Sequence, residues 1–225
     1  MLLLALDTAT SAVTVALHDG TTVIAEESLV DSRRHAETLT PMIASVVAGA
    51  GRAPADLTAI AVGVGPGPFT GLRVGIATAT TLGLALDLPV HGICSLDALA
   101  HAAAQEQGTP SDFVIASDAR RKEVYWARYR ATADGVERVS GMPQVCRPAE
   151  LPDEIRALPA AGRGPQLYPD AFAAALLPLD APAGGVASYT IQQLAAGREL
   201  LPVQPLYLRQ PDAKPATAQK SVLPR

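Results

Sequence analysis

Two aspartates stand where a carboxylate could take part in phosphate or metal chemistry. Asp7 follows the apolar run 2–6, Asp118 follows the apolar run 113–117, and each begins a polar turn. If the two turns flank one cleft, their carboxylates could hold Mg²⁺ together with a nucleotide. Thr8, Arg120 and Glu123 would then line the same cleft. The alternative is that each aspartate caps its own turn with its side-chain oxygen. The repetition of the pattern favours the cleft, and both alternatives stay open.

A loop rich in glycine and proline is the second candidate. It consists of Gly65, Pro66, Gly67, Pro68, Phe69, Thr70 and Gly71. Its prolines and glycines end the preceding strand, and we expect Thr70 to cap the helix that follows. The backbone N–H groups could bind an anion there, or the turn could set a close strand–helix packing. The glycine spacing matches neither standard nucleotide fingerprint.

Other chemistries find little support. The histidines His18, His35, His91 and His101 do not pair at a metal-ligand spacing, so we expect no zinc or iron site. The Gly-x-Ser-x-Gly motif of serine hydrolases is missing. Gly184 and Gly185 precede a helical pattern and would let an adenine approach, although glycine pairs are common in loops. One polar-aromatic cluster is either a functional surface or the solvated face of one strand: Arg120, Glu123, Tyr125 and Trp126.

The elements that must position these residues occur twice along the chain. We expect strands at 2–6, 12–18, 22–29, 59–64 and 90–93, and helices at 35–50, 71–86 and 96–107, with Asp31 or Ser32 capping the first helix and Ser95 the last. The pattern restarts with strands at 113–117 and 123–130, weaker helical patterns at 148–157, 169–176 and 188–197, and a strand or extended segment at 203–209. This repeat predicts an α/β fold of two related lobes, 1–108 and 109–208, each with a mixed sheet and flanking helices, and a loose tail at 209–225.

Composition limits the class of protein. The 225 residues are 48% hydrophobic, which is enough for a substantial core, and the net charge is −4. No lysine- and arginine-rich run of the kind that follows a phosphate backbone occurs, so we do not expect this chain alone to bind nucleic acid strongly. Cys94 and Cys146 indicate buried thiols in a reducing compartment. The apolar runs are too short or too polar for a signal peptide or a membrane span, so we expect a soluble, cytoplasmic protein.

Two expected helices are short of charge. In 72–86 the only charged residue is Arg73, and in 35–50 the only formal charge is Glu37. The three-and-four spacing of 35–50 predicts a core stripe of Ala36, Leu39, Ile43, Val46, Val47 and Ala50, with Thr38, Met42, Ser45 and Gly49 on the opposite side. A surface helix normally has a polar face. The helices therefore either contact another chain or are buried in one large core, and the pattern alone does not separate these interpretations.

Several segments together resemble one family. They are LALDTATSAVTVAL, RRHAETLTPMI, GVGPGPFTGLRVGIATATTLGLALDLPVHGICSLDALA, DARRKEVYWARY and the late PLYLR. They are similar to the TsaB (YeaZ) family, the partner subunits in making threonylcarbamoyladenosine in bacterial tRNA. The resemblance extends to about residue 209. Lys122 is a departure, because the family often has glycine or a small polar residue there.

The resemblance implies an actin-like ASKHA (ribonuclease H-like) fold and a non-catalytic subunit. Its implied partners are TsaD, which transfers the threonylcarbamoyl group to N6 of adenosine 37 in tRNAs reading ANN codons, and the ATPase TsaE. TsaD binds its metal through His-x-x-x-His, and the matching positions here are Ser95 and Leu99. We therefore expect no metal, contact with tRNA only through the complex, and no membrane. The resemblance implies no tightly bound cofactor in this chain alone and allows ATP or ADP at the junction of the complex.

The family pairs through a helical bundle, which favours the interface interpretation of the charge-poor helices. We expect the partner interface to include His35, Thr38, Leu39, Met42, Ile43, Ser45, Val46 and Arg73. The same helices could form a homodimer when TsaD is absent. The alternative function is a free-standing ASKHA-type kinase that phosphorylates a small molecule with Mg-ATP held by Asp7 and Asp118.

Overall fold

The computed structural model describes residues 1–30, 35–133 and 135–209. The first half contains β1 (Leu3–Asp7), β2 (Ala12–His18), β3 (Val23–Val30), α1 (His35–Gly49), η1 (Pro54–Asp56), β4 (Ala59–Gly65), α2 (Phe69–Leu86), β5 (Val90–Cys94) and α3 (Ser95–Gln105). The second half contains β6 (Asp112–Asp118), β7 (Val124–Thr132), β8 (Gly135–Arg138), β9 (Gln144–Cys146), η2 (Pro148–Glu150), α4 (Asp153–Arg156), β10 (Ala160–Ala161), α5 (Arg163–Leu167), η3 (Pro169–Ala171), β11 (Ala175–Leu176) and α6 (Ala183–Ala195).

The two halves contain sheets of the same design. The first sheet has the strand order β3-β2-β1-β4-β5, with antiparallel β1–β2–β3 and parallel β1–β4–β5. The path of the second is β8-β7-β6-β10-β11, with the corresponding antiparallel and parallel pairs, and β9 pairs with β7 beside it. The predicted α/β fold with two mixed sheets is therefore confirmed. The central strands β1, β2 and β4 are fully buried, which explains the apolar runs of β1 and β4; β2 also buries the polar residues Thr14 and His18.

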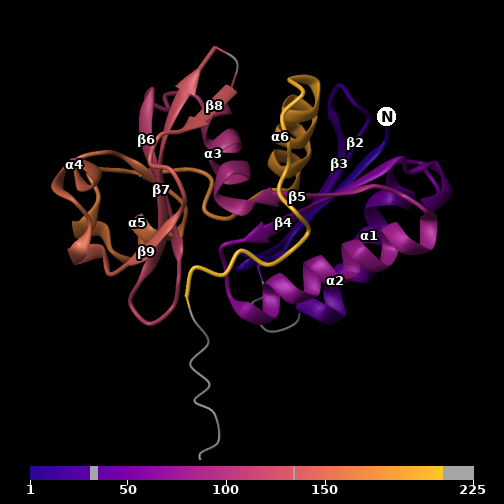
Figure 1. The fold of residues 1–225 in the computed structure, drawn as a ribbon, viewed down its shortest axis with the longest axis horizontal. Coiled ribbons are helices and arrows are strands. Elements are labelled where there is room, and N and C mark those ends of the chain that lie inside the picture. Colours follow the sequence, from indigo (N-terminus) through magenta and orange to yellow (C-terminus); the bar gives the residue numbers. More distant parts are fainter. Residues whose placement is uncertain (31–34, 134, 210–225) are drawn as a thin grey trace, which may run out of the picture.

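Helices cover the sheets in layers (Figure 1). α1 and α2 lie on the outer face of the first sheet, where Leu39 and Val46 belong to the same core cluster as Leu4 and Val62. α3 and α6 lie between the two sheets. α6 is the last helix among the described residues, yet Ala183 and Val186 pack on the first sheet against Leu3. The two halves thus share the helical layer between them.

Several predicted elements differ from the observed ones. Helix α2 begins at Phe69 with Pro68 as its N-cap, so Thr70 lies inside the helix and is not its cap. Cys94 is the N-cap of α3, so the predicted cap Ser95 is wrong. The helix predicted at 169–176 is a short 3₁₀ turn followed by β11, and the helix predicted at 188–197 begins at Ala183. The candidate caps Asp31 and Ser32, and residues 210–225 of the tail, lie outside the described residues.

The segment 201–209 connects the two halves in an extended path. Leu201 bridges to Gly92 in β5, and the N–H of Leu206 donates to the carbonyl of Val64 at 2.8 Å. Arg209 then reaches the second half, where it pairs with Glu123 and donates to the carbonyl of Ala119 at 3.3 Å. Of the two alternatives predicted for 203–209, the extended segment is the observed one.

Candidate functional site

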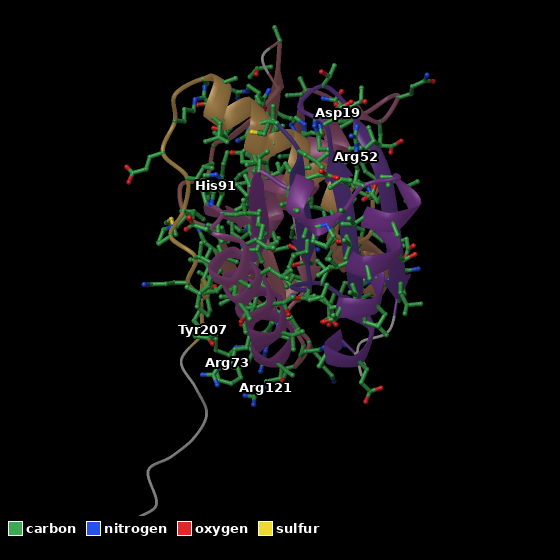
Figure 2. All side chains as sticks on the ribbon, turned by 90° about the vertical axis from the view of Figure 1, so that its right-hand side faces the viewer. Asp19, Arg52, Arg73, His91, Arg121 and Tyr207 are labelled. Carbon is green, nitrogen blue, oxygen red and sulfur yellow. The ribbon has the colours of Figure 1, made fainter. Side chains whose placement is uncertain are left out.

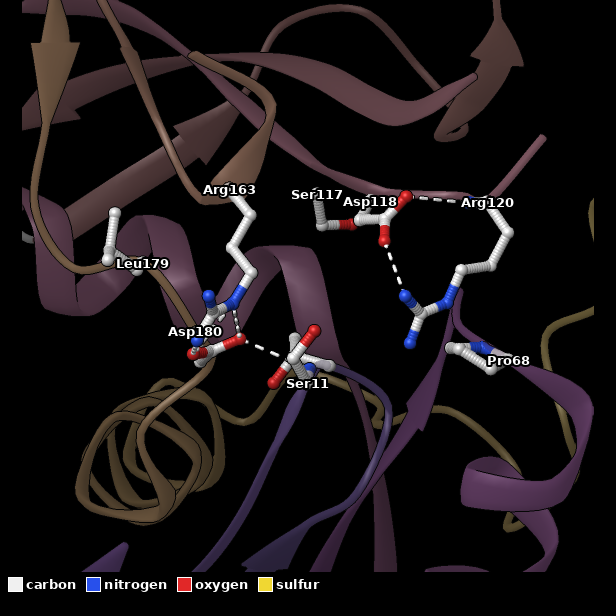
Figure 3. A pocket seen from close by; sticks show the side chains of 9 residues that line it. Ser11, Pro68, Ser117, Asp118, Arg120, Arg163, Leu179 and Asp180 are labelled. Carbon is white, nitrogen blue, oxygen red and sulfur yellow. Dashed lines mark hydrogen bonds and ion pairs between the residues drawn. The ribbon is translucent and has the colours of Figure 1, made fainter. Parts of the chain in front are cut away.

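The space between the halves is closed by two ion pairs (Figure 3). On one side Arg163 donates to Asp180 at 2.6 Å, and Asp180 also accepts the N–H of Ser11 at 3.1 Å. On the other side Arg120 pairs with Asp118 at 3.0 Å. Ser11 belongs to the first half and Asp180 to the second, so the first pair is part of a link between them.

The cavity enclosed there is too small for a nucleotide. It has a volume of about 10 Å³ and is lined by Thr10, Ser11, Pro68, Ser117, Asp118, Arg120, Arg163, Leu179 and Asp180. That volume accommodates about one water molecule, and the hydroxyl of Thr10 has no hydrogen-bond partner among the described residues. Binding sites for small molecules measure roughly 300–1,000 Å³. In this conformation the residues between the halves do not fit ATP or ADP.

The cleft candidates separate into three places. Asp118 and Arg120 line the cavity. Asp7 and Thr8 are buried below it, where the Thr8 hydroxyl donates to the carbonyl of Gly71 at 2.7 Å. Glu123 pairs with Arg209 instead.

Both aspartates cap their own turns. Oδ1 of Asp7 accepts the N–H of Ala9 at 2.7 Å, and Oδ1 of Asp118 accepts the N–H of Arg120 at 2.7 Å. These equivalent bonds, each two residues along the chain, bear out the turn-capping alternative.

Asp7 is a fully buried acid in the core of the first half. Its Oδ2 accepts a hydrogen bond from the Ser95 hydroxyl at 2.5 Å, and Ser95 Oγ accepts the N–H of Gly65 at 3.2 Å. Burial raises the pKa of Asp7 from its ordinary value of 3.8 to about 6, although the bonds from Ser95 and Ala9 oppose the increase. The ionised carboxylate is therefore less favourable in the folded protein than in water. Its burial lowers the stability of the fold, and this penalty is fully present above pH 6.

We expect Asp7→Asn to stabilise the protein at pH 8 by about 1–3 kcal/mol, because the shift corresponds to about 3 kcal/mol. The raised pKa means that folding gains protons between pH 3.8 and 6, so wild-type stability falls as the pH rises through that range. The advantage of the variant should consequently vanish near pH 4. Urea denaturation from pH 4 to 8 measures this, with the exposed Asp170→Asn as the matched control. An advantage independent of pH would contradict the assigned cause.

The glycines of the loop 65–71 serve close packing. Gly65 has φ +103°, which favours glycine, and a Cβ on Gly67 would lie 2.2 Å from the carbonyl oxygen of Ala9. A Cβ on Gly75, one turn into α2, would lie 2.4 Å from Oγ1 of Thr8. The loop thus seats α2 directly on the turn after β1. These contacts support the packing interpretation of the loop over the anion-binding one.

Helix α2 is only partly covered. It is long and apolar enough by length and composition to cross a membrane, with a mean hydropathy of 1.3, and no other helix of the described ranges has this property. Small residues occupy its sheet-facing side, and only 28% of it is buried inside the chain. Opposite them runs an exposed stripe of Phe69, Arg73, Ala77, Thr81 and Leu84, with Leu84 85% exposed. α1 contacts α2, and its exposed residues are also largely small.

The residues predicted at the partner interface divide by exposure. Four of them, Leu39, Met42, Ile43 and Val46, pack into the core of the first half, so their assignment as contact residues is corrected. Met42 lies on the sheet-facing side of α1, although the helical spacing placed it opposite. Ser45 and Arg73 are exposed and Thr38 is half-buried, so for these residues the interface stays a prediction. His35 begins α1, and its side chain lies outside the described part of the structure.

Two other candidate groups are structural. A Cβ on Gly184 would approach Oε2 of Glu26 to 2.8 Å, and one on Gly185 the carbonyl oxygen of Ala98 to 2.8 Å. These glycines therefore let α6 pack closely and do not form an adenine site. Tyr125 and Trp126 are buried, so the predicted polar-aromatic cluster is not one surface.

Comparisons with known proteins agree with this fold. The family model described as "TsaD: tRNA N6-adenosine threonylcarbamoyltransferase" matches residues 23–215. An uncharacterised protein of Mycobacterium leprae is 45% identical over 227 residues, which cover 96% of this chain and 57% of that protein, so the chain spans little more than half its length. The tRNA threonylcarbamoyladenosine biosynthesis protein TsaB of Escherichia coli is 36% identical over 174 residues, covering 76% of this chain and 74% of that protein.

A solved structure extends the similarity over most of the chain. YeaZ from Pseudomonas aeruginosa superposes with a TM-score of 0.80 and 33% identity, and the match covers 92% of this chain and 99% of that one. The chain belongs to the TsaB (YeaZ) family. Its two sheets of equal strand order accordingly form the ASKHA-like fold expected from the resemblance.

Within this TsaB-family fold, the positions that match the metal ligands of TsaD have other uses. Ser95 is occupied by its bonds with Asp7 and Gly65, and Leu99 is buried in the core of the second half. Between them, Asp97 accepts hydrogen bonds from Tyr129 at 2.7 Å and Arg138 at 3.3 Å. Among the described residues, no group of three histidine, cysteine or acidic side chains could hold a metal ion.

Sequence reasoning missed the Ser11–Asp180–Arg163 link and the contacts of residues 201–209. Asp180 lies 169 residues beyond Ser11 in the chain, and no local pattern connects them. For residues 201–209 the PLYLR motif contains the only available signal, because an apolar and aromatic run is unusual for a loose tail.

Proposed function

We propose that this chain is a non-catalytic subunit that pairs with the threonylcarbamoyltransferase TsaD. The pair, joined by the ATPase TsaE, would modify N6 of adenosine 37 in tRNAs reading ANN codons, in the cytoplasm. The observation that carries the proposal is the C-terminal part of the exposed stripe of α2, where Leu84 is 85% exposed beside the small exposed residues Ala77 and Thr81. Burying such a surface against a partner is favourable by roughly 25 cal/mol per Å² before association costs.

The non-catalytic role is supported by the residues at the positions that match the metal ligands of TsaD. Ser95 and Leu99 are both fully buried and engaged in the fold, so neither can present a ligand to solvent. The kinase alternative has no comparable support, because the cavity between the halves has a volume of only about 10 Å³.

Light scattering after size exclusion tests the proposal, with this chain alone and mixed with TsaD from the same cell. We expect a peak at the summed mass, because the exposed stripe of α2 needs an apolar partner surface. If this chain forms a homodimer that disappears on mixing with TsaD, the homodimer contact and the TsaD contact use the same surface. Unchanged peaks for the two proteins at micromolar concentration would contradict the proposal.

A further inference from the structure

Three distant segments meet at one end of the molecule. Phe69 and Arg73 come from the start of α2, Arg121 and Lys122 from the turn between β6 and β7, and Tyr207 from the segment 201–209. We call these five residues the cationic–aromatic patch. Figure 2 shows Arg73, Arg121 and Tyr207 at this end, with Asp19 and Arg52 at the opposite one.

The aromatic part of the patch is held in one arrangement. The rings of Phe69 and Tyr207 stack with centroids 5.4 Å apart and an interplanar angle of 19°. The guanidinium carbon of Arg73 lies 3.6 Å from the centroid of Phe69, and Nε of Arg73 donates to the Tyr207 hydroxyl at 3.3 Å. Even so, Phe69 is 47% exposed and Tyr207 43% exposed. An aromatic surface is therefore both fixed in position and accessible.

The cationic part of the patch lies on a turn whose backbone conformation is unfavourable for the residue types that occupy it. Arg120, Arg121 and Lys122 have φ values of 59°, 54° and 62°. This left-handed conformation costs an L-residue with a Cβ roughly 1–2 kcal/mol, and glycine or asparagine usually occupies it. Three consecutive long cations stand there, and Arg121 and Lys122 are exposed. Their presence despite the conformational cost indicates a use for the charges.

Arg209 connects the two parts. It follows Tyr207 by two residues, pairs with Glu123 and donates to the carbonyl of Ala119. Ala119 and Glu123 flank the cationic turn, and their backbones are joined by a 3.0 Å hydrogen bond. The position of Tyr207 is thereby tied to that of the turn.

Charge at this end contrasts with that of the whole protein. The patch has three cations, Arg73, Arg121 and Lys122, whereas the net charge of the chain is −4. A local positive surface on an acidic protein favours a polyanion.

We propose that the cationic–aromatic patch binds RNA, with Arg121 and Lys122 at phosphates and Tyr207 stacked on an unpaired base. Single-stranded RNA presents phosphates and the faces of unstacked bases together, and proteins recognise it through cations beside exposed aromatic rings. The inference rests on the proposed function, since the RNA is the tRNA that the paired subunits modify. It adds that this chain contacts the tRNA itself. The few cations make the contact weak without the partner subunit.

The test uses the complex of the full chain with TsaD and a fluorescein-labelled tRNA, titrated by anisotropy at 50–200 mM salt. The double variant Arg121→Ala/Lys122→Ala should bind about 10-fold more weakly and decrease the salt slope by about 1–2, because each phosphate contact releases about one counterion. Tyr207→Ala should weaken binding by about 5-fold or more with an unchanged slope, and Tyr207→Phe should restore it. The matched control is Arg52→Ala, an exposed arginine at the opposite end of the molecule, which should leave both quantities unchanged.

Light scattering on the same samples reports pairing separately. Variants that pair normally and lose tRNA affinity support the inference. Variants that pair and bind tRNA like the wild type overturn it and leave the proposed function intact. If the patch variants lose pairing, the patch contacts protein and the RNA assignment is wrong. If the wild-type chains do not pair, the proposed function fails and this inference fails with it.

Discussion

Leu84→Glu is expected to abolish pairing with TsaD, weakening it by at least about 100-fold, without unfolding the protein. Leu84 is 85% exposed and makes little contribution to the core, so the free energy of unfolding should change by less than about 1 kcal/mol. In a complex the same position would bury an unpaired carboxylate, which costs several kcal/mol. Isothermal titration against TsaD gives the affinity, and urea denaturation gives the stability.

Two further variants distinguish apolar contact from charge. Leu84→Lys should weaken pairing as strongly as Leu84→Glu, since either charge is costly in an apolar contact. If only one sign of charge has an effect, electrostatics and not apolar burial governs the surface. Leu167→Glu is the matched control, because Leu167 is an exposed leucine on α5 in the second half. If both Leu84 variants bind TsaD with wild-type affinity, α2 is not part of the interface.

Gly63→Ala is expected to destabilise the fold by about 3–5 kcal/mol, at the upper end of single substitutions. A Cβ on Gly63 would lie 1.7 Å from Oδ2 of Asp7 and 2.7 Å from Oγ of Ser95. The strand is fully buried and pairs on both sides, so the backbone cannot move away. Urea denaturation measures the loss, and Gly49→Ala, with no atom within 4 Å of the added Cβ, is the control.

A double variant tests the assigned clash. Asp7→Ala removes the carboxyl carbon and oxygen that the new Cβ would meet. Gly63→Ala should therefore cost much less in the Asp7→Ala background than alone, with a coupling of at least about 1 kcal/mol. Equal costs in both backgrounds would show that the clash with Asp7 is not the cause.

The fold was largely predictable, because its signals are local. Continuous apolar runs such as 59–64 indicate buried strands, and the strand–Asp–turn–strand pattern at Asp7 and Asp118 recurs in the second sheet. The errors lie where tertiary contacts override local preference. Ser95 has the residue type of a helix cap, but its hydroxyl bonds to Asp7, 88 residues away. The alanine-rich segment 169–176 has helical propensity, but β11 pairs with β10 and ends the helix early.

The candidate sites were less predictable than the fold. Helical periodicity assigned Leu39 and Val46 to one stripe and Met42 to the other, yet all three pack on the sheet because the apolar side of α1 is wide. Exposure of Leu84 depends on how closely the glycines of α2 approach the sheet, which a pattern of small residues does not specify. The contact between Tyr207 and Phe69 joins residues more than 130 positions apart.

The placement of α6 has a consequence for biosynthesis of the protein itself. Leu3 and Ala16, near the start of the chain, are covered by Ala183 and Val186 near its end. The first sheet is complete at Cys94, and α6 ends at Ala195. At a translation rate of roughly 5–20 residues per second, the sheet therefore exists for about 5–20 s before α6 is made. During that interval an apolar face of a nascent sheet is open to chaperones and to neighbouring chains. Completion of the first half is thus a late event on the ribosome, despite its place at the N-terminus.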